Sequence, residues 1–445
     1  MTTPVVGFMT TAAEHFPYER PRELQAQAIA ALRSLNAELI VADELVTNPA
    51  TAEAAASRFQ EGRIDLLVSL CGSFTWDNMP VRVAQELNVP IVLWGVPEPP
   101  MAGGRLEANS LVGVTMNAAA LKRVGQRYKF VYGMPEDHAA IEEIRRTVRV
   151  IGALKQLRHT RLGIVGSRPP GFYGSTYDEL RLRQALGIEV IPIEVSEVLA
   201  AYEGVPEAEV TAGLERVRRL GRQAGAQDDD LRRVARLYAG LRGLAQTERL
   251  SGIAVKCWPE LKDRMLNPCV VNSILTDEGI MTGCETDVHG TISMLIVYLL
   301  TGQPAFFADL VTFDEAQNTA LLWHCGAAPA SLAASREAVA LERHSIGTGI
   351  ATIEFPLREG RVTFTRLGPL DCGYRLLIVT GDAMPTGMPL RGNNIFVRTD
   401  LPVRQVVERI IERGVEHHYA LSYGDLRTDL LELCRWAGLQ AETLE

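Results

Sequence analysis

The chain of 445 residues lacks the long apolar segments and the basic excess that mark several large classes of protein. Its longest apolar run, Met294 to Leu300, is far shorter than the roughly 20 residues needed to cross a bilayer. The net charge of -9 argues against general nucleic-acid binding, which requires a basic surface, and does not favour an anionic membrane surface. We therefore expect neither nucleic acid nor a membrane as a partner.

Paired cysteines are also lacking. The seven cysteines are odd in number, and none forms a Cys-x-x-Cys pair or shows the spacing of a zinc site. Several lie in apolar runs, where a free cysteine behaves as a small hydrophobic residue. This pattern suits a reducing compartment better than a disulfide framework. Because residues 1–5 also lack the features of a signal peptide, we expect a cytoplasmic protein.

Common cofactor and nucleophile motifs are missing as well. Gly163 and Gly166 lie near a strand but do not complete the Gly-x-Gly-x-x-Gly fingerprint of dinucleotide-binding proteins. Neither a Gly-x-x-x-x-Gly-Lys-Ser/Thr phosphate loop nor a Gly-x-Ser-x-Gly nucleophile elbow occurs. These absences disfavour the enzyme classes that depend on those motifs.

What the chain does have is the composition of a globular protein, with 47% hydrophobic and 22% charged residues, and a length that exceeds one ordinary core. Over the first 150 or so residues, apolar strand-like runs alternate with helical segments. This alternation is typical of a parallel sheet covered on both faces. The expected strands lie at residues 5–9, 38–41, 64–70 and 90–94, and the expected helices at 21–35, 51–61 and 81–87.

The rest of the chain divides into a second unit of this kind and a different, β-rich part. The second unit has expected strands at 161–167, 187–193 and 252–257, with helices at 206–220 and 229–245. From about residue 281, short strands separated by Gly and Pro turns follow a helix over 288–300, at 305–308, 349–355, 361–365 and 374–380, before a final helix at 425–437. We predict an α/β protein with two Rossmann-like, doubly wound parallel-sheet domains, 1–158 and 159–280, and a β-rich, barrel-like C-terminal domain, 281–445, that carries part of the metal site.

Two carboxylates in the middle of the chain follow apolar, strand-like runs. Glu260 ends the segment that begins at Gly252, and Asp287 lies in Gly283-Cys-Glu-Thr-Asp287-Val-His-Gly290. Ligands bind at the carboxyl edge of open α/β sheets, and two carboxylates there can hold a divalent metal and move a proton. The alternative is that both residues cap helices. We predict that both are metal ligands and catalytic groups.

A histidine pair, His417 and His418, lies near the end of the chain. Imidazole is a common ligand for Mn²⁺, Fe²⁺, Co²⁺ and Zn²⁺. Adjacent residues of a strand point to opposite faces, so we expect at most one of the two to enter a site. An exposed pair at a loop edge is the alternative.

Further side chains are candidates for substrate binding. His324 precedes a Gly turn and either lines a pocket or is a core histidine, and His289 follows Asp287 by two positions. Arg391 and Asn393 share a polar turn that suits hydroxyl-rich or carboxylate ligands, with an ordinary loop as the alternative. The aromatic candidates lie beside expected ligand-side loops, although each alone is more often core packing: Trp76, Tyr173 and Trp258.

These segments together resemble the L-fucose isomerase and L-arabinose isomerase superfamily, and in particular its divergent fucose isomerase-like branch. The resemblance covers roughly residues 160–425 and is strongest over 252–326. It rests on Lys256-Cys-Trp-Pro-Glu260, Gly283-Cys-Glu-Thr-Asp287, Phe307-Ala308-Asp309, Trp323-His324-Cys325-Gly326 and His417-His418.

The resemblance implies the three-domain arrangement predicted above and a Mn²⁺-dependent interconversion of an aldose and a ketose, with Co²⁺ or Mg²⁺ as alternative metals. It implies that Glu260, Asp287 and one of His417 or His418 hold the metal. It also implies a trimer or hexamer with sites between subunits. The expected substrate is a small sugar, either a pentose, a hexose or a deoxyhexose.

On this hypothesis, Glu260 and Asp287 move a proton between carbons 2 and 1 of the sugar through an enediolate whose charge the metal stabilises. Glu260→Gln is then expected to remove nearly all turnover while leaving the fold intact. Two alternatives stay open, because a fold does not determine a function. One is a metal-dependent epimerase or aldolase that uses the same enediolate, and the other is a non-catalytic sugar-binding or sensor protein of the same architecture.

Overall fold

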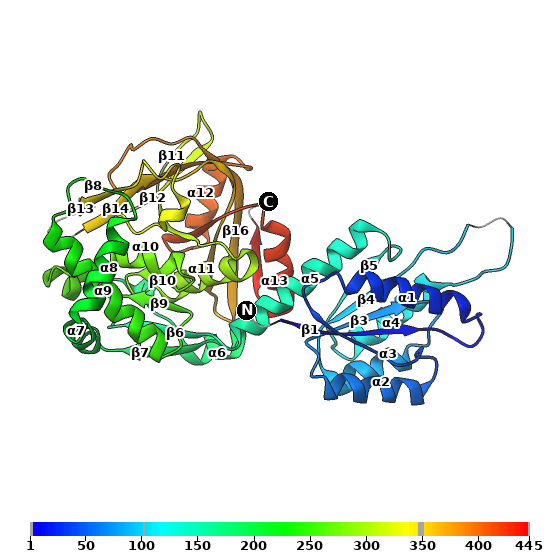
Figure 1. Cartoon of the computed structure of the whole chain (residues 1–445). Coiled ribbons are helices and arrows are strands. Elements are labelled where there is room, and N and C mark those ends of the chain that lie inside the picture. The colour runs from blue at the N-terminus through cyan, green and yellow to red at the C-terminus, as the bar shows by residue number, and fades with distance from the viewer. Residues whose placement is uncertain (1–2, 101–102, 346–350, 444–445) are drawn as a thin grey trace. The chain divides into compact units, whose positions relative to one another are not determined.

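The computed structural model describes residues 3–100, 103–345 and 351–443, and the chain forms two compact units, Met1–Gln156 and Leu157–Glu445 (Figure 1). None of the helices in these described ranges is long and apolar enough to cross a membrane.

The first unit is a five-stranded parallel sheet with helices between its strands. The strand order β2-β1-β3-β4-β5 is the flavodoxin-like order of doubly wound proteins. β3 and β4 are buried at every position, which is why they appear in the sequence as unbroken apolar runs. The strands are β1 (Val5–Thr11), β2 (Glu38–Val41), β3 (Leu66–Cys71), β4 (Ile91–Gly95) and β5 (Tyr128–Tyr132), and the helices are α1 (Glu19–Leu32), α2 (Pro49–Glu61), α3 (Asn78–Leu87), α4 (Ser110–Arg123) and α5 (His138–Leu157).

The second unit begins with a four-stranded parallel sheet in the order β10-β9-β6-β7. Its strands are β6 (Arg161–Val165), β7 (Glu189–Ile193), β9 (Gly252–Val255) and β10 (Met281–Cys284). Its helices are α6 (Glu179–Leu186), α7 (Val195–Glu203), α8 (Glu207–Arg218), α9 (Asp228–Thr247), α10 (Cys269–Asp277) and α11 (Val288–Thr301). Short helical turns at Tyr173–Ser175 and Cys257–Leu261 follow β6 and β9.

The β-rich part of this unit contains a closed antiparallel barrel. The ring runs β16-β15-β18-β11-β12-β17 and closes because β17 also pairs with β16. Closure leaves no open edge among these strands. They are β11 (Phe306–Asp314), β12 (Thr319–His324), β15 (Gly360–Pro369), β16 (Tyr374–Met384), β17 (Asn393–Thr399) and β18 (His418–Tyr423). The same sheet continues through β14 (Ala351–Pro356), β13 (Ala340–Arg343) and β8 (Arg222–Gln223), while β19 (Gln440–Thr443), α12 (Val403–Glu412), a turn at Ala330–Leu332 and α13 (Arg427–Ala437) complete the unit.

Helix α11 lies between the parallel sheet and the barrel, in contact with β9 and β10 on one side and β15 and β18 on the other. Its residues from Val288 to Val297 are all buried, as expected for a helix that packs on several sides. One apolar core joins strand residues of both sheets, including Val255 and Phe364. The parallel sheet and the barrel are therefore packed as one compact body.

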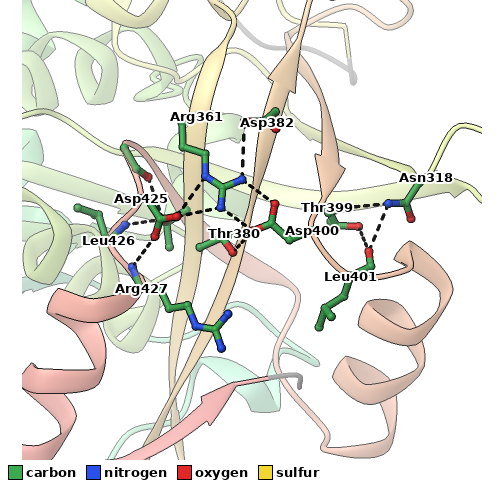
Figure 2. Close-up of polar contacts among 12 residues, drawn as sticks. Asn318, Arg361, Thr380, Asp382, Thr399, Asp400, Leu401, Asp425, Leu426 and Arg427 are labelled. Atoms are coloured by element: carbon green, nitrogen blue, oxygen red, sulfur yellow. Dashed lines mark hydrogen bonds and ion pairs between the residues drawn. The ribbon is translucent and has the colours of Figure 1, made fainter.

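An arginine on the barrel links three segments of the β-rich part (Figure 2). Arg361 of β15 donates to both oxygens of Asp400, at 2.6 and 2.5 Å, and to Asp425 at 2.9 Å. Asp400 follows β17 and also accepts from Thr380 of β16, whereas Asp425 follows β18. The bidentate pair with Asp400 ties β15 to the end of β17 across β16, and the bond to Asp425 ties β15 to the end of its neighbour β18.

The predicted fold class is confirmed: parallel α/β sheets are followed by a barrel-containing, β-rich part. The domain boundaries at 158 and 280 stay a prediction. Several elements had no clear sequence signal, among them β17. β10 was expected as a strand-like run before Asp287, but its bounds were not, because its Met-Thr-Gly-Cys sequence is poor in strand-forming residues. Of the strand predicted at 349–355, residues 349–350 lie outside the described residues, and β14 begins at Ala351.

Candidate active site

A cavity of about 260 Å³ lies in the second unit where β9, β10, β11 and β12 end or pass. The carboxyl edge of a parallel sheet is where α/β proteins bind ligands. The lining of the cavity combines carboxylates, imidazoles, thiols and two indole rings. The lining residues are Cys257, Trp258, Lys262, Asn267, Cys269, Cys284, Glu285, Asp309, Trp323, His324, Cys325 and His344.

The turn between β10 and α11 brings Glu285 to this cavity. Glu285 and Thr286 have φ values of 58° and 52°, in the left-handed region that non-glycine residues rarely adopt. The amide of Thr286 donates to the carbonyl of Val255 at 3.2 Å, and the amide of Asp287 donates to that of Cys284 at 3.0 Å. Such a conformation costs about 1–3 kcal/mol per residue and is found at functional sites. Here it sends Glu285 into the cavity lining, which does not include Asp287.

Glu285 and Asp309 both approach the Nε2 atom of His418. The distances from Nε2 are 3.6 Å to Oε2 of Glu285 and 3.5 Å to Oδ1 of Asp309, and Nε2 of His417 lies 3.5 Å from the same Glu285 oxygen. Strand pairing explains the arrangement, because Asp309 of β11 lies directly opposite His418 of β18. His324, at the end of β12, joins Asp309 and His418 in a group whose ligand atoms lie within 4.8 Å of one another.

This donor set fits a divalent metal ion. Oε2 of Glu285 and Oδ1 of Asp309 are both buried and have no hydrogen-bond partner among the described residues. A buried, unpartnered carboxylate oxygen is costly unless a cation satisfies it. Carboxylate oxygens with imidazole nitrogens are the ligands of Mn²⁺, Co²⁺ and Fe²⁺ sites.

Asp287 lies behind His418 and positions its ring. Oδ2 of Asp287 is 2.9 Å from Nδ1 of His418 and 2.5 Å from the guanidinium of Arg366, and Oδ1 accepts the amide of Gly290 at 2.9 Å. Burial alone would raise the pKa of Asp287, but Arg366 and His418 together hold it well below its usual range. With Nδ1 held by this carboxylate, Nε2 remains for the cavity side, as in carboxylate–histidine pairs at metal sites.

The pKa values of His324 and Cys325 are also strongly shifted. Burial favours the neutral imidazole, but Cys325, Asp309 and Glu285 raise the pKa of His324 to about 10. Sγ of Cys325 lies 3.5 Å from Nδ1 of His324. The thiol of Cys269 and the two neighbouring imidazoles, His324 and His344, lower the pKa of Cys325, although burial opposes this.

Glu260 is placed differently from Asp287. One of its oxygens accepts from Nζ of Lys256 at 2.6 Å, and this hydrogen bond lowers the pKa of Glu260 against the effect of burial. The other oxygen is buried without a hydrogen-bond partner among the described residues. Glu260 belongs to none of the ligand groups found there. Its predicted metal-binding and catalytic roles, like those of Asp287, stay predictions.

The two histidines of the late pair both reach Glu285. His417 precedes β18 and is not part of the strand, so the alternation of strand side chains does not separate it from His418. His418 is buried, whereas the side chain of His417 is 51% exposed. The choice between them as a metal ligand stays open. Both belong to a possible ligand group with Glu285, and His418 also belongs to the group with Asp309 and His324.

Two of the predicted substrate-binding residues line the cavity, Trp258 and His324. The indole of Trp258 donates to Oε1 of Glu285 at 3.3 Å. Tyr173 is 78% exposed beneath the guanidinium of Arg168 and is not among the lining residues. Trp76 lies in the first unit, against Phe74 and His15.

The remaining three predicted residues have structural partners. Arg391 pairs with Glu354 at 2.7 Å, and Asn393 bridges the amide of Ala328 and the carbonyl of Ile353. His289 is buried against the ring of Tyr374, and burial followed by the charge of Arg366 lowers its pKa to about 4. Their roles toward a substrate stay predictions.

Sequence reasoning gave no role to several residues of the site: Glu285, Asp309, Lys262, Arg366 and the four cavity cysteines. Glu285 and Asp309 lie in the quoted segments Gly283–Asp287 and Phe307–Asp309, so the signal was present but not resolved to these side chains. Neither Arg366 nor the cysteine grouping has a local signal, because their partners lie far away in the sequence.

Comparison with known proteins gives the class. The chain is 31% identical over 407 residues to the sulfoquinovose isomerase of Priestia aryabhattai, covering 91% of each chain. It is 32% identical to that of Alkalicoccus urumqiensis, over 80% of this chain and 81% of the relative, and 31% identical to that of Clostridium sp. (strain MSTE9), over 82% and 83%. The protein is therefore a sugar isomerase of the aldose–ketose type.

Its particular family follows from the same relatives. The model of the fucose/sulfoquinovose isomerase N-terminal domain matches residues 7–158, a region in which the sequence showed no motif of this kind. The chain belongs to the fucose/sulfoquinovose isomerase family, which confirms the resemblance to the fucose isomerase-like branch. A solved sugar-binding protein from Actinobacillus succinogenes with bound D-allose has 11% identity, covers 68% of this chain and 92% of its own, and has a TM-score of 0.19, too low to support any argument.

Proposed function

We propose that this protein is a metal-dependent aldose–ketose isomerase whose substrate is sulfoquinovose, a hexose that carries a sulfonate. The choice of sulfoquinovose as the substrate rests on one observation, the 31% identity to a sulfoquinovose isomerase over 91% of both chains. The cavity supports an anionic sugar, because Lys262 is the one lysine or arginine among the described residues that line it. Trp258 and Trp323 add aromatic faces suited to a sugar ring.

The metal of the proposal is Mn²⁺ or a similar ion, held by Glu285, Asp309 and His418, with His324 and His417 as neighbouring donors. When bound, such an ion would act as a Lewis acid toward the substrate oxygens. Asp287 holds the imidazole of His418 in orientation through Nδ1. Support for this part comes from the unpartnered oxygens of Glu285 and Asp309.

Glu260 is the proposed general base. Lys256 fixes one carboxylate oxygen at 2.6 Å and keeps the group ionised, while the buried second oxygen has no hydrogen-bond partner among the described residues and is available to accept a proton. A carboxylate with one restrained oxygen can take the proton from carbon 2 of the sugar and return it to carbon 1. Glu260 is not itself among the lining residues of the cavity, although Trp258 and Lys262, two positions to either side of it in the sequence, both are.

We also propose that the protein is a homo-oligomer, as the family resemblance implies. The edge strand β5 exposes Phe130 and Tyr132, each 45% accessible, and their rings lie 6.0 Å apart. Leu111 and Val112 of α4 are also exposed. Exposed aromatic and aliphatic side chains of this kind occur at subunit interfaces. Light scattering of the wild type and of Phe130→Glu tests this part, because a trimer or hexamer that the substitution breaks would support it.

The test of the reaction is proton NMR in deuterated water with sulfoquinovose, its sulfonate-free analogue quinovose, and L-fucose, each with Mn²⁺ and with EDTA. We expect a ketose from sulfoquinovose with Mn²⁺ and none with EDTA. Exchange at carbon 2 that yields a second aldose would indicate an epimerase. Turnover of quinovose or fucose in preference to sulfoquinovose would contradict the proposed substrate, and sugar binding without conversion would contradict the enzyme.

A further inference from the structure

Two thiols and one imidazole meet at the cavity apart from the carboxylate–histidine groups. Sγ of Cys269, Sγ of Cys325 and a ring nitrogen of His344 all lie within 4.8 Å of one another. The three residues come from separate elements, because Cys269 begins α10, Cys325 follows β12 and His344 follows β13. All three line the cavity. The fold therefore assembles a grouping that the spacing of the cysteines in the sequence does not show.

The chemistry of this grouping is that of a soft divalent cation site. Zn²⁺ binds thiolate sulfur at about 2.3 Å in tetrahedral geometry, which places two sulfur ligands about 3.8 Å apart. The two sulfur atoms lie at most 4.8 Å apart here, so small side-chain movements would bring them to about 3.8 Å. Hard ions such as Mg²⁺ prefer oxygen ligands, so the grouping selects against them.

The geometry of the grouping, and not a preformed thiolate, supports cation binding there. Contact with Cys325 and burial raise the pKa of the Cys269 thiol, so this thiol loses its proton only when a cation binds. Cys257 and Cys284 line the same cavity. Neither belongs to the group whose ligand atoms lie within 4.8 Å of one another, which leaves the fourth position of a tetrahedral ion to a water molecule.

We propose that Cys269, Cys325 and His344 form a binding site for a soft divalent cation of the Zn²⁺ class, separate from the site at Glu285, Asp309 and His418. Binding forms two metal–sulfur bonds and one metal–nitrogen bond. The two thiols release their protons to solvent, and no group is oxidised or reduced.

The experiment uses Co²⁺ as a spectroscopic probe, added to the full-length protein under anaerobic conditions with a phosphine reductant. Thiolate ligation produces a near-ultraviolet charge-transfer absorption that oxygen and nitrogen ligands do not. We expect this band to saturate at about one Co²⁺ per chain and to disappear when Zn²⁺ displaces the probe, since Zn²⁺ binds thiolate sites more tightly than Co²⁺.

Variants locate the site. Cys269→Ser and Cys325→Ser are expected to abolish the band, and His344→Asn to weaken Co²⁺ binding by about tenfold or more. The matched controls Cys71→Ser and Cys434→Ser replace buried cysteines elsewhere and are expected to keep it. Glu285→Gln is also expected to keep it, which separates this site from the carboxylate–histidine groups.

Circular dichroism of each variant checks that it folds, and His344→Asn provides a variant that leaves the buried thiols in place. Absence of the band in the folded wild type would overturn the proposal. Its persistence in both cysteine variants, or formation of a Cys269–Cys325 disulfide in place of metal binding under the reducing conditions, would overturn it as well. None of these readouts uses isomerase activity, so failure of this proposal and failure of the proposed function are distinguishable.

Discussion

Asp287 and His418 are joined by a 2.9 Å contact between Oδ2 and Nδ1, although they lie 131 positions apart in the sequence. Asp287 caps α11 through the amide of Gly290 and also meets the buried guanidinium of Arg366. The same carboxylate therefore caps the helix and contacts the ring of His418. The role that we propose for Asp287 depends on this contact with His418.

The buried ion pair of Asp287 and Arg366 makes a prediction about stability. Asp287→Asn can keep the helix cap, but it leaves the charge of Arg366 buried without its carboxylate. Removing one partner of a buried pair costs about 3–5 kcal/mol, and we expect the free energy of unfolding of the second unit to fall by that amount. Urea unfolding measures it. The double variant Asp287→Asn with Arg366→Met should be more stable than Asp287→Asn alone, and additive losses would show that the two residues are not coupled.

Substitutions of Glu285 and Glu260 are expected to change different quantities, metal affinity in the first case and turnover alone in the second. Glu285→Gln removes a buried, unpartnered ligand oxygen, so the affinity for Mn²⁺ should fall by about 100-fold or more, and turnover with it. Glu260→Gln should leave metal affinity near that of the wild type and lower turnover by about 10²–10⁴-fold, the range for loss of a general base. Calorimetric titration with Mn²⁺ and steady-state kinetics measure the two effects, with the exposed Glu408→Gln as control. A comparable loss of metal affinity in Glu260→Gln would make Glu260 a ligand, as the family resemblance implies.

Lys262 is expected to set the preference for an anionic sugar. Replacing it by Gln removes the one lysine or arginine side chain among the described cavity residues. Because a hydrogen bond to a charged group contributes about 1.5–3 kcal/mol, we expect kcat/KM for sulfoquinovose to fall by about tenfold or more. The value for any sulfonate-free sugar that the enzyme converts should change little. An equal loss for both sugars would assign Lys262 to a part of the cavity that does not meet the sulfonate.

The Arg361 cluster on the barrel predicts a pH dependence of stability (Figure 2). The hydrogen bond from Arg361 lowers the pKa of Asp400, with burial opposing and Thr380 assisting. A folded pKa below the unfolded value of about 3.9 means that the stabilisation is present above that pH and is lost as the pH falls through the folded pKa. Asp400→Asn should therefore cost about 1 kcal/mol at pH 7, the scale of a partly exposed pair, and less near pH 3. Thermal unfolding at both pH values measures this.

Asp382→Asn is the matched control for that experiment, because Asp382 lies on the same face at 3.7 Å from Arg361 and is 59% exposed. It should change stability less than Asp400→Asn at pH 7. A destabilisation by Asp400→Asn that is the same at both pH values would point to lost packing in place of a lost charge interaction.

Prediction of the fold from the sequence succeeded where elements have a strong local pattern. The buried strands β3 and β4 and the charged, amphipathic helix α9 were found close to their observed bounds. β10 was expected as a strand-like run before Asp287, but its bounds were not predicted, since it has only four residues. β12 and β17 were not found as strands, and both are buried by partners that come from distant parts of the chain. Local pattern carries no information about such partners.

For the candidate site, too, the sequence revealed the local features and missed those that depend on distant residues. The segments around Glu260, Asp287 and His418 were recognisable, because carboxylates after apolar strands and paired histidines are local features. The direction in which each side chain points was not. The left-handed turn at Glu285 and Thr286 makes Glu285, and not Asp287, part of the cavity lining, and nothing in the local residue types favours that turn.

The sequence by itself determined the class of the fold, the family and the segments that carry the chemistry, since these depend on local periodicity and on short motifs. The tertiary structure alone decided which atoms meet. Strand register places Asp309 opposite His418, and barrel closure joins β16 to β17. The ends of β12 and β13 bring Cys325 and His344 to Cys269. The physical reason is that these contacts depend on the register and packing of segments far apart in the chain, which no local run of residues specifies.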